Sequence, residues 1–124
     1  MAKQKSKYVD GFVLVVPKKK LGVYKKMARQ GQKIWKKHGA IDYKECVADD
    51  MRAPWALPFP KLVKLKKDEV VMFSYITYKS RKHRDAVNKK VMSDPSMHDP
   101  EVMNMEMPFD MKKMAYGGFK VLVD

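Results

Sequence analysis

The chain alternates between short apolar runs and longer amphipathic segments. Residues 8–16 and 114–123, near its two ends, are β-branched and aromatic runs bounded by Lys, Pro or Asp. That composition is typical of buried strands. Residues 18–38 repeat apolar side chains at three- and four-residue steps and stop at Gly39, which predicts an amphipathic helix with a glycine cap.

The middle of the chain predicts two more strands and a second helix. Residues 41–48 alternate polar and apolar positions, as edge strands do. Residues 70–78 are apolar on both faces and predict a central strand. Ser80 is a favourable N-cap for a helix over residues 81–92. An ordered, proline-containing loop and an irregular excursion are predicted for residues 52–61 and 97–111.

The resulting order, β-α-β-β-α-β, predicts an α+β fold. It closes as a four-stranded antiparallel sheet with two helices on one face, the ferredoxin-like arrangement, with the first and third strands central. Helices cover only one face, yet both central strands are apolar on both faces. An apolar patch of roughly several hundred Å² would then stay exposed in a monomer. We therefore predict a homodimer with its sheets packed face to face, a dimeric α+β barrel.

Length and composition narrow the class of protein. The 124 residues form one domain, residues 1–124, with residues 1–7 as a flexible polar tail. The apolar run at 12–16 is too short for a signal peptide or a membrane span, and the single Cys46 agrees with a reducing compartment. We expect a cytoplasmic protein with no membrane partner. No phosphate loop, nucleophile elbow or paired metal-ligand spacing occurs, so no cofactor is expected.

The formal net charge of +13 raises the question of nucleic acid. The basic residues are scattered lysines with only four arginines, which favours a solvated surface with weak, non-specific attraction to polyanions. The run at 116–119 superficially resembles part of an RNA-recognition strand motif, but it falls in the last strand. A bulge or a close backbone approach explains Gly117 and Gly118 better.

The first turn of the second predicted helix is a candidate anion site. Arg81, His83 and Arg84 stand there beside free backbone N–H groups, which suits a carboxylate or a phosphate. His83 also shares the inward helix stripe and would meet a ligand between helix and sheet. In the alternative interpretation Arg81 pairs with Asp85 on a solvated face, and His83 is a hydrogen-bonded core residue.

Two strand carboxylates are candidate proton acceptors. Glu45 shares a strand face with Tyr43, and Asp10 lies beside the apolar positions of the first strand. If those faces point inward, burial would suit either group for proton transfer. The alternative is that each carboxylate pairs with a lysine. Tyr75, on the central strand, is a further candidate for ligand binding.

The methionines of the segment before the last strand give a weaker signal. Met103, Met105 and Met107 stand at every second residue with His98 nearby, a spacing that can hold Cu(I). Methionine is also a common gap-filler of loosely packed lids, and we predict no metal site.

Four blocks of the chain resemble a known family. They are YVDGFVLVVP (8–17), WKKHGAIDYKECVADD (35–50), SRKHRDAVNKKVMSDP (80–95) and MPFDMKKMAYGGFKVLVD (107–124). They closely resemble the bacterial YbaA-like family of unknown function. The resemblance implies a ferredoxin-like fold in the dimeric α+β barrel superfamily and no established reaction. Superfamily relatives include cofactor-independent monooxygenases, haem-degrading enzymes and small-molecule-binding stress proteins, an analogy by fold alone.

Together these features predict a cytoplasmic homodimer that binds a small anionic or aromatic molecule between sheet and helices. An enzyme of this kind would carry out cofactor-free oxidation or isomerisation, with His83 or Glu45 as base and Arg81 as anion clamp. The alternatives are an RNA- or polyanion-binding module and a structural dimer without a ligand. The remaining ligand-binding candidates are Arg84, Asp10 and Tyr75.

Overall fold

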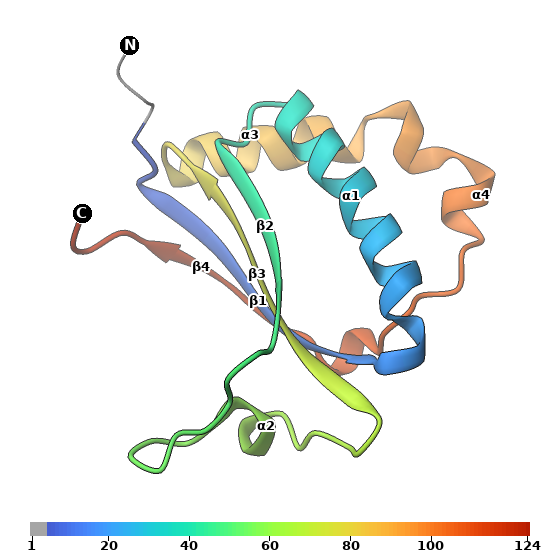
Figure 1. Cartoon of the computed structure of the whole chain (residues 1–124). Helices are drawn as coiled ribbons and strands as arrows, with labels where there is room; N and C mark the ends of the chain where they lie inside the picture. Colours follow the sequence, from blue (N-terminus) through green and yellow to red (C-terminus); the bar gives the residue numbers. More distant parts are fainter. Residues whose placement is uncertain (1–4) are drawn as a thin grey trace.

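A computed structural model describes residues 5–124 as a four-stranded antiparallel sheet with its two long helices on one face (Figure 1). The strand order is β2-β3-β1-β4, so the first and third strands are central, as predicted. Both central strands are ten residues long, whereas the outer strands have six. The strands are β1 (Tyr8–Pro17), β2 (Asp42–Val47), β3 (Glu69–Tyr78) and β4 (Ala115–Lys120).

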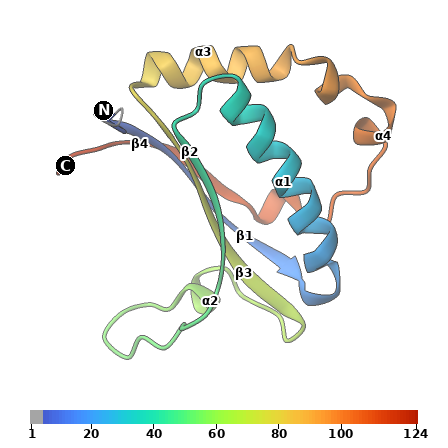
Figure 2. The ribbon, with the colours of Figure 1, turned by 45° about the horizontal axis from the view of Figure 1, so that its top comes forward.

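Two long helices lie on the same side of the sheet (Figure 2). They are α1 (Leu21–Lys37), which follows a 3₁₀ turn at Lys18–Lys20, and α3 (Arg81–Met92). Gly39 ends the first helical segment with a φ of +113°, a left-handed conformation that favours glycine. The segments predicted as loop and irregular excursion contain short helical turns: α2 (Phe59–Leu62), α4 (Pro100–Met103), and 3₁₀ turns at Pro95–His98 and Met111–Lys113.

Alternate residues of the central strands build the core beneath the helices. Leu14, Val16 and Met72 pack with α1, and Ile76 and Tyr78 pack with α3. The core is continued on the helices by Tyr24, Ala28, Val87 and Val91, all of them buried. Each helix therefore covers one half of the same sheet face, which leaves the space between α1 and β2 to be filled by side chains from both.

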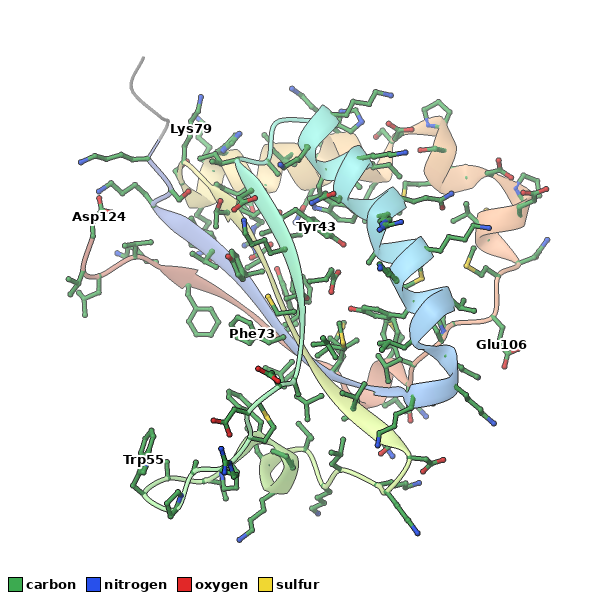
Figure 3. The ribbon with its side chains drawn as sticks, viewed as in Figure 1. Tyr43, Trp55, Phe73, Lys79, Glu106 and Asp124 are labelled. Atoms are coloured by element: carbon green, nitrogen blue, oxygen red, sulfur yellow. The ribbon has the colours of Figure 1, made fainter. Side chains whose placement is uncertain are left out.

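The opposite face of the sheet is apolar and partly open. Phe73 points away from α1 (Figure 3) and is 45% exposed, and Phe119 is 61% exposed. The predicted two-faced apolarity of the central strands is confirmed. The register between β1 and β4 is continuous, so no bulge occurs at Gly117. Instead the Phe119 ring lies 3.4 Å from where a Cβ on Gly11 would stand, a close approach within one chain.

The start of the described chain is tied to the sheet. The Lys7 N–H donates to the Tyr78 carbonyl at 2.9 Å, and the Ser6 hydroxyl lies 3.1 Å from that of Thr77. Of the tail predicted at 1–7, residues 1–4 lie outside the described residues. Within residues 5–124, no helix is both long enough and apolar enough to cross a membrane.

Candidate functional site

Glu45 lies on the helix-facing side of β2 and receives hydrogen bonds from two tyrosines. The Tyr24 hydroxyl of α1 donates to its Oε1 at 2.6 Å, and the Tyr43 hydroxyl, from the same strand, donates to its Oε2 at 3.0 Å. The strand face that Glu45 shares with Tyr43 therefore points toward α1. Its partners are phenols and not the expected lysine. A carboxylate has about four lone-pair positions, so this one can accept further donors.

A glycine on α1 makes room for one of these phenols. A Cβ on Gly31 would lie 2.9 Å from the Tyr43 hydroxyl oxygen and 3.6 Å from Cζ of the same ring. Gln32, one residue on, donates from its side chain to the Tyr43 carbonyl at 3.0 Å. Gly31 thus leaves room for the Tyr43 hydroxyl, and Gln32 fixes the Tyr43 backbone. Figure 3 shows this tyrosine between β2 and α1.

Glu45 and its two tyrosines separate two cavities and line both. The outer cavity measures about 400 Å³ and opens beside Lys25, Arg29 and Gln32 of α1. The inner cavity measures about 180 Å³ and lies against the sheet. Its remaining walls are almost wholly apolar and aromatic: Phe12, Leu14, Met27, Trp35, Ser74, Ile76, Phe109 and Met114. Polar chemistry is therefore concentrated on one carboxylate at the boundary between an apolar chamber and a cationic mouth.

Burial keeps both phenols protonated. It raises the pKa of Tyr24 far above the ordinary value, and the hydrogen bond to Glu45 raises it further. The pKa of Tyr43 is raised in the same way, by burial first and then by the negative charge of Glu45. Both tyrosines are therefore fixed donors, and Glu45 is the acceptor of the cluster.

Asp10 and Arg84 form a separate, buried ion pair with each other. Arg84 Nη1 lies 2.8 Å from Asp10 Oδ1 and 2.7 Å from the Tyr116 hydroxyl, while its Nε donates to Asp85 at 2.8 Å. The guanidinium also lies over the Tyr8 ring. Burial raises the pKa of Asp10, and the charge of Arg84 opposes that rise. Asp10 and Arg84 therefore neutralise each other's charge, and the partner of Asp10 is an arginine and not the expected lysine.

The other candidates are dispersed. His83 Nδ1 accepts the Lys79 N–H at 3.0 Å, and the ring packs edge-on against Tyr78, so this side chain closes the start of α3. Burial lowers the pKa of His83, and the charge of Lys79 adds to the effect. Arg81 lines a cleft at the end of the sheet, and the register places Tyr75 on the face away from the helices. Neither residue lines a cavity beside Glu45.

A second polar cluster joins the ends of the two long helices. His38 Nε2 lies 2.6 Å from Oδ2 of the buried Asp94, and Lys37 Nζ lies 3.2 Å from the same oxygen. Hydrogen bonds from Ser96 and then from His38 lower the pKa of Asp94 well below its ordinary value. The cluster is saturated by the chain's own groups, and we assign it to holding α1 against the segment after α3.

His98, the candidate ligand near the methionine segment, is hydrogen-bonded to the backbone. His98 Nε2 lies 2.8 Å from the Met92 carbonyl. In residues 5–124, no group of three or more His, Cys, Asp and Glu side chains is placed to hold a metal ion. Met103, Met105 and Met107 are between 37% and 68% exposed, so their thioethers do not fill a packed interior.

Sequence reasoning placed Tyr43 on the strand face of Glu45, but it did not predict that Tyr43 and Tyr24 donate hydrogen bonds to this carboxylate, and it missed the cationic mouth. Tyr24 and Arg29 stand on the same helix as the apolar stripe, where Tyr24 counts simply as a core residue. A usable signal was the spacing of Tyr43 and Glu45, two residues apart on one strand face, opposite a helix that carries another tyrosine.

Fold and site define a small α+β protein with a carboxylate-centred cavity between its sheet and first helix. The chain belongs to the family described as protein of unknown function (DUF1428), whose model matches residues 7–111. It is 43% identical over 118 residues to the uncharacterized protein YbaA of Escherichia coli K12, covering 95% of this chain and 98% of that protein. The same figures hold for YbaA of Escherichia coli O157:H7 and of Shigella flexneri. The predicted YbaA-like family is confirmed.

One solved structure, a Bacillus cereus protein related to NIF3, aligns with 98% of this chain at 12% identity and a TM-score of 0.39. The chain spans 27% of that protein.

Proposed function

We propose that this protein binds a small aromatic molecule in the cavity between α1 and the sheet, with a hydroxyl or N–H group of the ligand donating to Glu45. The observation that carries the proposal is the position of Glu45, held by two phenols in a wall shared by both cavities. Spare lone pairs on a carboxylate in such a place suit a ligand that brings its own donor.

The size and lining of the inner cavity indicate a single ring. An apolar cavity of about 150 Å³ is known to hold benzene, and the inner chamber measures about 180 Å³. Trp35, Phe12 and Phe109 offer ring faces and edges to an aromatic guest. A ring that also carries an anionic substituent would instead occupy the outer cavity, which Glu45 lines as well and where Arg29 and Lys25 lie at the mouth. A hydroxylated aromatic acid meets all three requirements: an aromatic ring, a hydrogen-bond donor for Glu45 and an anionic group for the two cations.

A catalytic version of the proposal uses the same carboxylate. Glu45 would take the proton that the ligand presents and return it at another atom, a cofactor-free isomerisation that conserves atoms and electrons. His83 is a weaker candidate for this role, because its Nδ1 already accepts a backbone N–H and it lines neither cavity.

We further propose that the sheet is of the ferredoxin-like type and that a second copy covers its open face, giving a dimeric α+β barrel. The face away from the helices carries Val9, Val13, Phe73, Tyr75 and Phe119. An obligate homodimer buries more than about 2,000 Å² in total, and we expect this interface to do so. Light scattering at micromolar concentration should give twice the chain mass of 14.4 kDa; a stable monomer would refute this assembly.

Calorimetric titration with matched single-ring compounds tests the ligand proposal. Benzoate, phenol and 4-hydroxybenzoate vary the donor and the acid independently. We expect 4-hydroxybenzoate to bind best, and Glu45→Gln to weaken both hydroxylated compounds about tenfold or more, because a hydrogen bond to a charged group contributes about 1.5–3 kcal/mol.

Two controls sharpen the titration. Arg29→Gln should weaken the two acids and leave phenol unchanged, whereas Asp85→Asn, on an exposed carboxylate of α3, should change nothing. If none of the three compounds binds, or if Glu45→Gln binds the hydroxylated compounds as well as the wild type does, the proposal is wrong.

A further inference from the structure

We propose a second binding site, an anion cleft for a compact ligand with two or more phosphate groups, at the end of the sheet where α3 begins. A cavity of about 540 Å³ opens there. None of the residues that line it is acidic, and four are cationic: Lys7, Lys79, Arg81 and Lys120. Tyr8 and Ser80 add hydroxyl groups to the same wall.

The four cations come from segments far apart in the sequence. Lys7 precedes β1, Lys79 joins β3 to α3, Arg81 begins α3, and Lys120 ends β4. Backbone hydrogen bonds bring them together, because the Lys7 N–H donates to Tyr78 at 2.9 Å and the Lys7 carbonyl accepts from Val121 at 3.0 Å. Their convergence is therefore a product of the tertiary fold and not a run of surface lysines.

Three of these charges have no partner. Among residues 5–124, Lys7 pairs with Asp124, whereas Lys79, Arg81 and Lys120 form no ion pair with an acidic side chain. Like charges that converge on one concavity repel each other, and a bound anion removes that cost. Figure 3 places Lys79 and Asp124 at the same end of the sheet.

Phosphate matches the donors that the cleft presents. The guanidinium of Arg81 can hold two phosphate oxygens at once, and ammonium groups bind the remaining charge. The twelve-residue α3 adds the first-turn N–H groups of Arg81 and Lys82, which have no helical acceptors, whereas the N–H of His83 donates to the Ser80 hydroxyl. A single carboxylate would leave most of the positive charge uncompensated, whereas a pyrophosphate neutralises it. All four cations line one cavity, which favours a compact anion over a nucleic-acid strand.

Calorimetric titration at constant ionic strength tests the cleft, with pyrophosphate, tripolyphosphate, inorganic phosphate and sulfate as probes. We expect the two condensed phosphates to bind more tightly than the single anions. Arg81→Gln and Lys120→Gln should each weaken pyrophosphate about tenfold. Asp124→Asn should strengthen it, because Lys7 then loses its competing carboxylate.

Lys82→Gln is the matched control, since Lys82 is exposed, adjoins Arg81 and does not line the cleft. It removes the same charge and should leave pyrophosphate affinity unchanged, as should Glu45→Gln, which separates this site from the aromatic cavity. Equal losses in Lys82→Gln and Arg81→Gln would overturn the cleft in favour of net charge alone. Binding of a short single-stranded RNA without binding of pyrophosphate would overturn it in favour of a nucleic-acid surface.

Discussion

Gly31→Ala should destabilise the protein, although alanine normally stabilises a helix. The added methyl group would stand 2.9 Å from the Tyr43 hydroxyl oxygen, closer than a carbon and an oxygen can pack, so the ring must move. The move breaks the 3.0 Å hydrogen bond to Glu45. Alanine gains about 0.5–1 kcal/mol over glycine in a helix, whereas a hydrogen bond to a charged group is worth about 1.5–3 kcal/mol. The net loss should be about 1–2 kcal/mol.

Two further variants test whether the clash with the Tyr43 hydroxyl causes the loss of stability. Gly22 also lies in α1, and a Cβ there meets no atom within 4 Å, so Gly22→Ala should stabilise the protein. In a Tyr43→Phe background the clashing oxygen is absent and the nearest ring atom stands at 3.6 Å, so Gly31→Ala should become stabilising. Urea unfolding at one fixed protein concentration measures the unfolding free energies of the wild type and of the four variants. If Gly31→Ala stabilises the wild type as much as Gly22→Ala does, Gly31 does not position Tyr43.

Asp10→Asn should cost about 3 kcal/mol in unfolding free energy, because it removes the buried carboxylate that pairs with Arg84 and leaves the guanidinium only the exposed Asp85. The exposed Asp85→Asn should cost under about 1 kcal/mol, and equal losses would contradict the buried ion pair. Because the pKa of Asp94 is lowered in the folded protein, its ionised form stabilises the fold above the ordinary aspartate pKa of about 3.9, and this stabilisation is lost as the pH falls below that value. Asp94→Asn should therefore reduce the fall in unfolding free energy at acid pH. An unchanged fall in the variant would count against this assignment. RNA binding in a filter assay should be weak, independent of sequence and lost between about 50 and 200 mM salt. Tight, sequence-selective binding at the higher salt would contradict the interpretation of the lysines as a solvated surface.

Element order could be predicted because it depends on local periodicity. The helix predicted over residues 81–92 has those bounds in the structure, since its N-cap and the following Asp94-Pro95 are local signals. Side-chain partners could not be predicted in this way. Arg84 and Asp10 are 74 residues apart, and their contact depends on how α3 sits across β1.

The part of the site that depends on local periodicity could also be predicted. The alternation of β2 put Glu45 and Tyr43 on one strand face, and the structure shows that this face points toward α1. Its contact with Tyr24 depends on the rotation of α1 against the sheet, which no residue pattern within the helix encodes. His83 was predicted to face a ligand from its place on the helix stripe, but its imidazole turns back to the Lys79 N–H, a local hydrogen bond that competes with that role.

The protonation state of a bound chromogenic phenol tests the central claim most directly. 4-Nitrophenol, titrated into the protein at the pH where half of the free compound is ionised, reports its own ionisation through the phenolate absorption band. If Glu45 accepts a hydrogen bond from the ligand, the neutral phenol binds in preference, so the phenolate band should fall on binding to the wild type and stay unchanged with Glu45→Gln. A phenolate band that is unchanged or stronger on addition of the wild-type protein would contradict the account.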